Sequence, residues 1–141
     1  EIRQRLYRAV EREIQNGADT FYLGGYGRFD RMAAGAVWEL KKKYPYIKSI
    51  LVLAYLNLEV DMEYYDETIY PPLENTPPRY AISKRNEWLA ANADTVIAYV
   101  IYSRGGAAKT LRYAQRMHKR IINLAVKNIL QQKQCERSVS C

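Results

Sequence analysis

Two short runs of this chain are apolar along their whole length, ILVLAYL at 50–56 and VIAYVIY at 96–102. A strand that buries only one face alternates apolar and polar residues, so runs without alternation indicate strands buried on both faces. Segments with apolar residues at helical spacing flank both runs. This alternation predicts a parallel sheet covered by helices on both faces, in a doubly wound α/β fold.

The spacing of apolar residues predicts the other elements. Apolar residues recur at every fourth position from Ile2 to Ile14, which is typical of an amphipathic helix, and Asn16-Gly17 ends it. We expect strands at 20–23, 49–56, 94–102 and 120–124, with later helices that end before Pro45, near Ala93 and at His118.

The segment from 57 to 78 has no sustained period and contains four prolines. We therefore expect a long loop that acts as a lid or an interface, or that is disordered. It holds six acidic residues and no Lys or Arg, whereas the rest of the chain has 22 basic and nine acidic side chains. Such a basic excess either keeps the surface solvated or serves a polyanionic partner, a nucleotide or a nucleic acid.

The length of 141 residues fits one domain, at 1–124, followed by a polar tail at 125–141. The longest apolar run is too short to cross a bilayer, so we expect no membrane partner and a cytoplasmic location. Cys135 and Cys141 both lie in the tail, and His118 is the only histidine. This composition argues against a disulfide framework, a metal site and a histidine-dependent catalytic triad. We expect neither a metal nor a cofactor.

The stretch FYLGGYGRFD, at 21–30, places three glycines between a strand and a helix. Backbone N–H groups at a helix N-terminus attract anions, and glycine lets a phosphate approach the backbone closely. Gly24, Gly25 and Gly27 therefore form either a tight turn or a phosphate-binding loop. The stretch matches neither the dinucleotide fingerprint nor a P-loop. Asp30 either caps the following helix or binds a ribose hydroxyl.

A second glycine loop, SRGGAAKT at 103–110, follows the last long apolar run. Ser103 offers a hydroxyl, Gly105 and Gly106 leave the backbone accessible, and Lys109 lies in the first helical turn. A cation there opposes the helix dipole, so a bound anion would relieve the conflict; an ordinary surface lysine is the alternative. In a doubly wound sheet both loops lie at the carboxyl ends of strands, where ligands bind.

Arg85 falls within the apolar stripe of the helix that ends near Ala93. A guanidinium group that is buried without a partner is costly, so we expect Arg85 to have one. The partner is either the carboxylate of Asp30 or Asp94, in a structural salt bridge, or an anion of the ligand.

The order of these features resembles the SLOG superfamily of Rossmann-like proteins, which groups the DprA/Smf proteins with the LOG phosphoribohydrolases. The resemblance rests on a strand ending in GG-x-G, on AISKRNEWLAANADTVIAYV at 81–100, and on SRGGAAKT. It covers about residues 2–124 and is closest to small bacterial YpsA-like members. It implies a nucleotide or nucleotide-derived ligand in a cleft between the two glycine loops, with Arg85 and Asn86 at its wall.

The chain departs from this family at two points. LOG enzymes carry a P-G-G-x-G-T-x-x-E motif whose Glu takes part in cleaving the N-glycosidic bond, and Arg112 stands at that position here. Family members also usually begin with a strand and a Gly-His-Arg-like turn before the first helix. This sequence starts directly with that helix, so we expect the first strand of the family to be missing.

We therefore expect a nucleotide-binding or nucleotide-sensing module rather than an enzyme. A nucleotide N-glycosidase or phosphoribohydrolase that uses Asp30, or an acidic residue of the predicted lid such as Glu63, as its acid is the first alternative. Single-stranded DNA binding like that of DprA proteins, favoured by the basic surface and thirteen tyrosines, is the second. SLOG relatives commonly self-associate, so we also expect a homo-oligomer.

Overall fold

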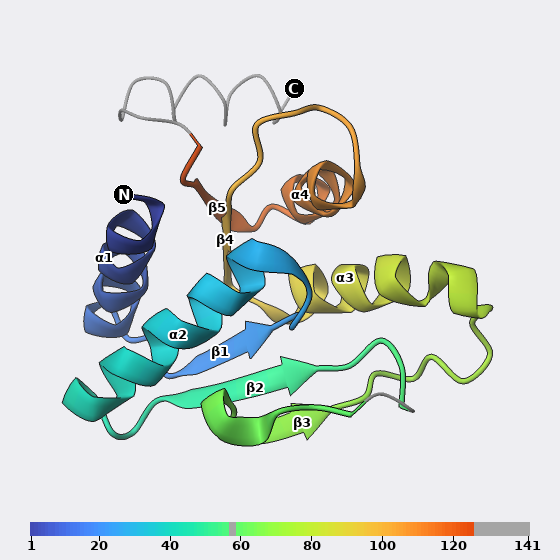
Figure 1. The fold of residues 1–141 in the computed structure, drawn as a ribbon. Helices are drawn as coiled ribbons and strands as arrows, with labels where there is room; N and C mark the ends of the chain where they lie inside the picture. The colour runs from blue at the N-terminus through green and yellow to red at the C-terminus, as the bar shows by residue number, and fades with distance from the viewer. Residues whose placement is uncertain (57–58, 126–141) are drawn as a thin grey trace. The chain divides into compact units, whose positions relative to one another are not determined.

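The structure, a computed structural model, describes residues 1–56 and 59–125 (Figure 1). The chain divides into two compact units, residues 1–85 and a unit that begins at Asn86. Both contain parallel strands and helices, so the predicted α/β class is confirmed. The tail predicted at 125–141 lies outside the described residues except for Ala125. Within the described ranges, no helix is long and apolar enough to span a membrane.

The described strands form two sheets rather than one, and the larger sheet belongs to the first unit. Its order is β1 (Thr20–Leu23), β2 (Lys48–Val52) and β3 (Glu67–Ile69), all parallel. Ile50, Leu51 and Val52 are buried although successive side chains of a strand point to opposite faces. The prediction that this strand is buried on both faces is therefore confirmed.

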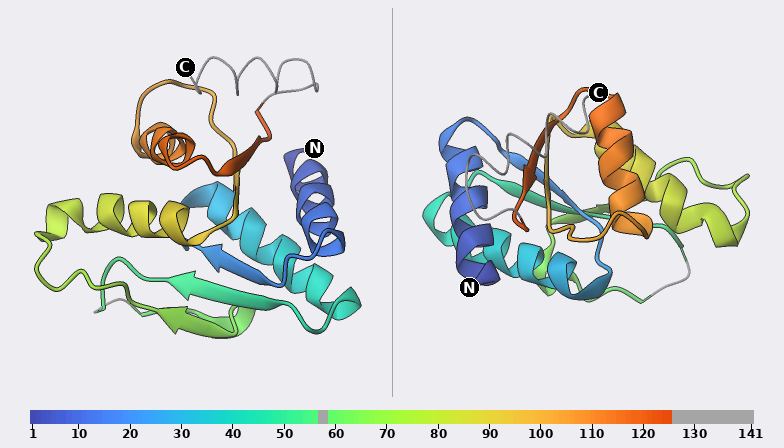
Figure 2. Two further views of the ribbon diagram at one scale, coloured as in Figure 1. Left: turned by 180° about the vertical axis from the view of Figure 1, so that it is seen from behind. Right: turned by 90° about the horizontal axis from the view of Figure 1, so that it is seen from above.

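Two helices accompany this sheet, α1 (Ile2–Gln15) and α2 (Gly27–Lys43). α2 packs on β1 and β2, and α1 packs against α2, as both views in Figure 2 show. α1 supplies Leu6, Val10 and Ile14 to the core, which explains their four-residue spacing in the sequence. Val37 and Leu40 of α2 are also fully buried. These contacts fix the N-terminal end of α2 beside the carboxyl end of β1.

The segment expected to be a loop, 57–78, contains a strand that the sequence analysis missed. β3 has only three residues, two of them polar, so no apolar run marks it. It pairs in parallel with β2, and Leu53 N–H donates the last bond of this ladder to the carbonyl of Ile69. Pro71 and Pro72 follow, and proline cannot donate to a ladder. Because the segment after β3 offers no donor at these prolines, the pairing stops and β2 ends at Val52, earlier than predicted.

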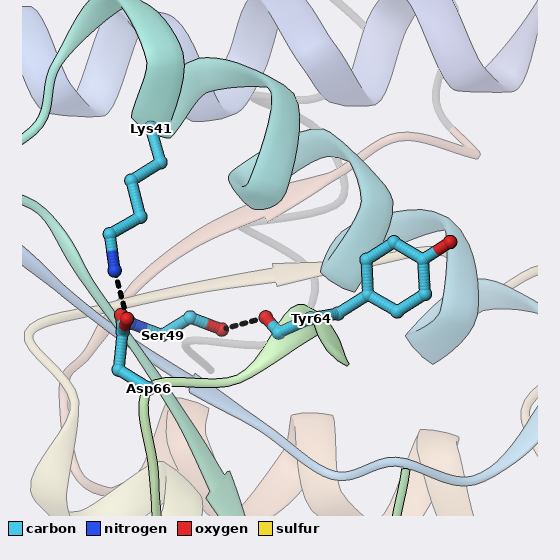
Figure 3. Close-up of polar contacts among 4 residues, drawn as sticks. All are labelled: Lys41, Ser49, Tyr64 and Asp66. Atoms are coloured by element: carbon cyan, nitrogen blue, oxygen red, sulfur yellow. Dashed lines mark hydrogen bonds and ion pairs between the residues drawn. The ribbon is translucent and has the colours of Figure 1, made fainter. Parts of the chain in front are cut away.

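A polar network fixes the start of β3 against β2 and α2 (Figure 3). Lys41 of α2 forms an ion pair with Asp66, whose Oδ2 accepts a hydrogen bond from Ser49 N–H at 2.8 Å. The Ser49 hydroxyl donates to the carbonyl of Tyr64 at 3.0 Å. Burial raises the pKa of Asp66, but the bonds from Lys41 and Ser49 outweigh it and hold that pKa below its ordinary value. The network satisfies the polar atoms of Ser49, which is fully buried.

The second unit has a two-stranded parallel sheet. It contains β4 (Thr95–Ala98), β5 (Arg120–Asn123) and α4 (Gly106–Arg116). α4 packs on both strands, and β5 lies where it was predicted. α3 (Ala81–Asn92) begins in the first unit and ends in the second.

β4 is shorter than the predicted strand at 94–102. Beyond Ala98 the side chain of Asn123 takes the place of a backbone partner, because it accepts from Val100 N–H and donates to the Val100 carbonyl, both at 3.0 Å. Every residue of β4 is only half-buried, and Ile101 and Tyr102 are 63% and 77% exposed. The described residues thus leave much of this apolar run uncovered. α4 ends at Arg116, two residues before the predicted end.

Candidate functional site

The loop from Gly24 to Gly27 joins β1 to α2 in the first unit. Gly25 and Gly27 have φ values of +73° and +83°, a region that side chains rarely adopt. A Cβ atom at Gly25 would lie 2.6 Å from Leu51 Cδ1, and one at Gly24 would lie 3.0 Å from Asp30 Oδ2. Backbone conformation and close packing beneath the loop therefore both require these glycines.

Arg85 lies beneath this loop with 2% of its surface exposed. Its Nη1 donates to the carbonyl of Gly24 at 2.6 Å and to the carbonyl of Val52 at 3.0 Å. Burial lowers the pKa of Arg85, and the negative charge of Asp30 opposes that shift. The sequence predicted a carboxylate or a ligand anion as partner; Asp30, one of the predicted carboxylates, interacts with Arg85 electrostatically, and Nη1 also donates hydrogen bonds to two carbonyls. Arg85 thus joins the carboxyl ends of β1 and β2.

Asp30 lies in the first turn of α2 and reaches back to the loop. Its Oδ2 accepts a hydrogen bond from the backbone N–H of Tyr26, the N-cap residue, at 2.9 Å. Burial raises the pKa of Asp30, and the Tyr26 bond and the positive charge of Arg85 oppose this without cancelling it. The capping interpretation of Asp30 therefore agrees with the structure, and its carboxyl group keeps a proton to a higher pH than an ordinary aspartate.

The outer side of the loop is exposed. Gly25, Gly27 and Arg28 are exposed, and Tyr26 is 39% exposed. The first N–H groups of any helix have no partner within the helix, and the Tyr26 side chain does not cap α2. This end of α2 can therefore attract an anion. It combines these N–H groups with the exposed guanidinium of Arg28 and the positive charge of Arg85.

Three tyrosines that the sequence analysis did not single out interact with Asp30 or Arg85. The Cζ atom of Arg85 lies 5.3 Å from the ring centroid of Tyr26. Tyr55 is close enough to influence the pKa of Arg85. The pKa of Tyr65 is raised, mainly by burial and then by the charge of Asp30. Only Tyr26 had a local signal, its place between two glycines; the other two come from distant segments.

The second glycine loop joins β4 to α4 in the second unit. Gly105 has a φ of +99° and is the N-cap of α4, which begins at Gly106. Arg112 donates to the carbonyl of Ser103 at 2.8 Å, and the Thr110 hydroxyl donates to the carbonyl of Gly106 at 2.8 Å. Arg112 therefore holds the loop in place.

The expected site residues fall into two groups. In the first unit the structure brings together Gly24, Gly25, Gly27, Asp30 and Arg85. In the second unit lie Asn86, Ser103, Gly105, Gly106 and Lys109. Lys109 is exposed and Asn86 is half-buried. That one ligand contacts both groups stays a prediction.

The side chains at the first loop limit its chemistry. Among residues 1–56 and 59–125, no three His, Cys, Asp or Glu side chains gather in a group that could hold a metal ion. The groups present at the loop are backbone N–H donors, two guanidinium groups, one carboxyl group and aromatic rings.

Comparisons with protein-family models, with curated proteins and with solved structures found no match.

Proposed function

We propose that this chain is a nucleotide-binding module of Rossmann-like fold, similar to SLOG proteins, with the loop from Gly24 to Gly27 holding a phosphate group. One observation carries the proposal: an exposed glycine turn at the start of α2 lies directly over the anchored guanidinium of Arg85. Helix N-termini with glycine turns bind phosphate through their N–H groups. A cytoplasmic location, where nucleotides are abundant, is part of the proposal.

The way the loop is packed supports a ligand site over a simple turn. Gly24 and Gly25 lie against Asp30 and Leu51 so closely that the backbone rests directly on the core. The opposite side of the loop carries no side chain at Gly25 or Gly27, so ligand atoms can reach the backbone there. Arg28 adds an exposed positive charge beside the same N–H groups.

Nucleotides should raise the melting temperature of the chain. We expect AMP, NAD, ADP-ribose or a cyclic nucleotide to stabilise the fold by about 2.7 kcal/mol at a hundred times its dissociation constant, a shift of several degrees. Arg28→Glu should reduce this shift, because it places a negative charge beside the phosphate. An acidic residue in the first turn favours the helix dipole, so the free variant should remain as stable as the unmodified chain.

Arg3→Glu is the matched control for this measurement. It makes the same charge change at an exposed position in the first turn of α1. The proposal predicts that Arg3→Glu keeps the full ligand-induced shift. Equal shifts in both variants would show that the N-terminus of α2 does not hold the phosphate.

A second candidate function is hydrolysis of the N-glycosidic bond, and the raised pKa of Asp30 favours it. A carboxyl group that keeps its proton can donate it to the leaving base while water adds to the anomeric carbon. Release of free base from a nucleotide should then fall as pH rises through the raised pKa of Asp30, and Asp30→Asn should abolish it. Chromatography of the products measures this; undetectable base across a nucleotide panel contradicts the enzyme.

A further inference from the structure

We infer that Tyr26 is the stacking platform for the base of the ligand, so the site selects nucleotides over sugar phosphates. This inference rests on the proposed function, because it specifies the class of ligand that the same loop accepts. Neither the sequence pattern nor the resemblance singled out Tyr26, and the structure provides three separate reasons for its role.

The first reason is that the ring of Tyr26 has a fixed cation beside it. The guanidinium of Arg85 lies 5.3 Å from the ring centroid, within the range of a cation–π contact. Arg85 cannot move freely, since its Nη1 is bonded to the carbonyls of Gly24 and Val52. Tyr26 as a whole residue is nonetheless 39% exposed, so it is open to contact with a ligand.

The second reason is that the backbone of Tyr26 is fixed before any ligand binds. Its N–H donates to Asp30 Oδ2 at 2.9 Å, and its φ and ψ of −118° and 131° are ordinary extended values. A rigid aromatic side chain loses little conformational entropy when it contacts a ligand. The glycines on both sides have no side chains that could shield the ring.

The third reason is the position of Tyr26 at the N-cap of α2, next to the N–H groups proposed to bind phosphate. A ligand that satisfies both features carries an anion and a planar ring a short distance apart, as a nucleoside monophosphate does. Aromatic side chains stack on any base, because every base has a π face. Tyr55 and Tyr65 are half-buried, and they interact electrostatically with Arg85 and Asp30 respectively.

Tyr80 is a natural control, because it resembles Tyr26 in exposure and in having a nearby cation. It is 49% exposed, and the Cζ atom of Arg79 lies 4.8 Å from its ring centroid. Arg79 is itself exposed, whereas Arg85 is buried and anchored. Tyr80 also lies outside the glycine loop, so its removal should leave ligand binding unchanged.

The test measures, by calorimetric titration, the affinities of AMP and ribose 5-phosphate for the unmodified chain and for variants at Tyr26. We expect AMP to bind between about fivefold and a hundredfold more tightly than ribose 5-phosphate, the range that one stacked base contributes. Tyr26→Ala and Tyr26→Leu should remove this preference and leave the affinity for ribose 5-phosphate unchanged. Tyr26→Phe and Tyr80→Ala should keep it.

The outcomes separate this inference from the proposed function. If ribose 5-phosphate binds and AMP is no tighter, or if both Tyr26→Ala and Tyr26→Leu keep the preference, stacking on Tyr26 is wrong while phosphate binding stands. If neither compound binds, the inference is overturned; the proposed function is overturned as well if NAD, ADP-ribose and cyclic nucleotides leave the melting temperature unchanged. Tyr26→Leu keeps apolar volume without a π face, so it decides the result if Tyr26→Ala does not fold.

Discussion

Arg85→Ala should lower the free energy of unfolding by about 3–5 kcal/mol, the cost of removing one partner from a buried charged cluster. The substitution leaves the carbonyls of Gly24 and Val52 without this donor and removes the positive charge that opposes the rise in the pKa of Asp30. Unsatisfied buried polar groups are costly, and the pKa of Asp30 should rise further. Urea denaturation followed by circular dichroism measures the change.

Lys84→Ala is the matched control, because it removes a neighbouring cation from the same helix at an exposed position. It should change the free energy of unfolding by less than about 0.5 kcal/mol, as surface substitutions usually do. If Arg85→Ala were as stable as Lys84→Ala but lost ligand binding, Arg85 would serve the ligand directly and its structural role would be wrong.

Gly25→Ala should have the second largest effect, a loss of about 2–4 kcal/mol. The added Cβ atom must adopt a φ of +73° and would lie 2.6 Å from Leu51 Cδ1. Leu51 is buried in the central strand of the sheet, so it has little room to move. The loop should therefore shift away from β2, and nucleotide binding should weaken together with stability.

Substitutions at two other glycines separate the two causes of this loss, backbone strain and the close contact with Leu51. Gly27 has a φ of +83° with no atom within 4 Å of an added Cβ, so Gly27→Ala should cost only the backbone strain, about 1–2 kcal/mol. Gly35 has neither strain nor crowding and lies inside α2, so Gly35→Ala should stabilise the chain by about 0.5–1 kcal/mol. Equal losses at Gly25 and Gly27 would contradict the contact with Leu51.

The fold could be predicted from the sequence where apolar residues follow a clear period. The four-residue spacing from Ile2 to Ile14 predicted α1, and the unbroken apolar run predicted a strand at β2. β3 could not be found this way, because its pairing with β2 stabilises it rather than its own side chains. The ends of β2 and β4 were misplaced for a related reason: strand length depends on how far the partner extends.

The sequence predicted which residues form the site better than it predicted which atoms they contact. Arg85 stood out because a charge interrupted an apolar stripe, and the structure buries it. Asp30, which acts on the charge of Arg85, was one of the predicted partners. The two carbonyl acceptors could not be predicted, since they belong to backbone that every residue has. Tyr55 and Tyr65 reach Asp30 and Arg85 only through folding, so no local pattern indicates them.

Titration of the isotopically labelled chain with AMP, followed by its amide NMR signals, tests the central claim most directly. The proposal predicts that the signals of residues 25–29 shift most and saturate at one ligand per chain, because the N–H groups of this stretch other than that of Tyr26, which bonds to Asp30, surround the phosphate. The same signals should shift little in Arg28→Glu. Unchanged signals at 25–29, or larger shifts in residues away from the loop, would contradict a phosphate site at the start of α2.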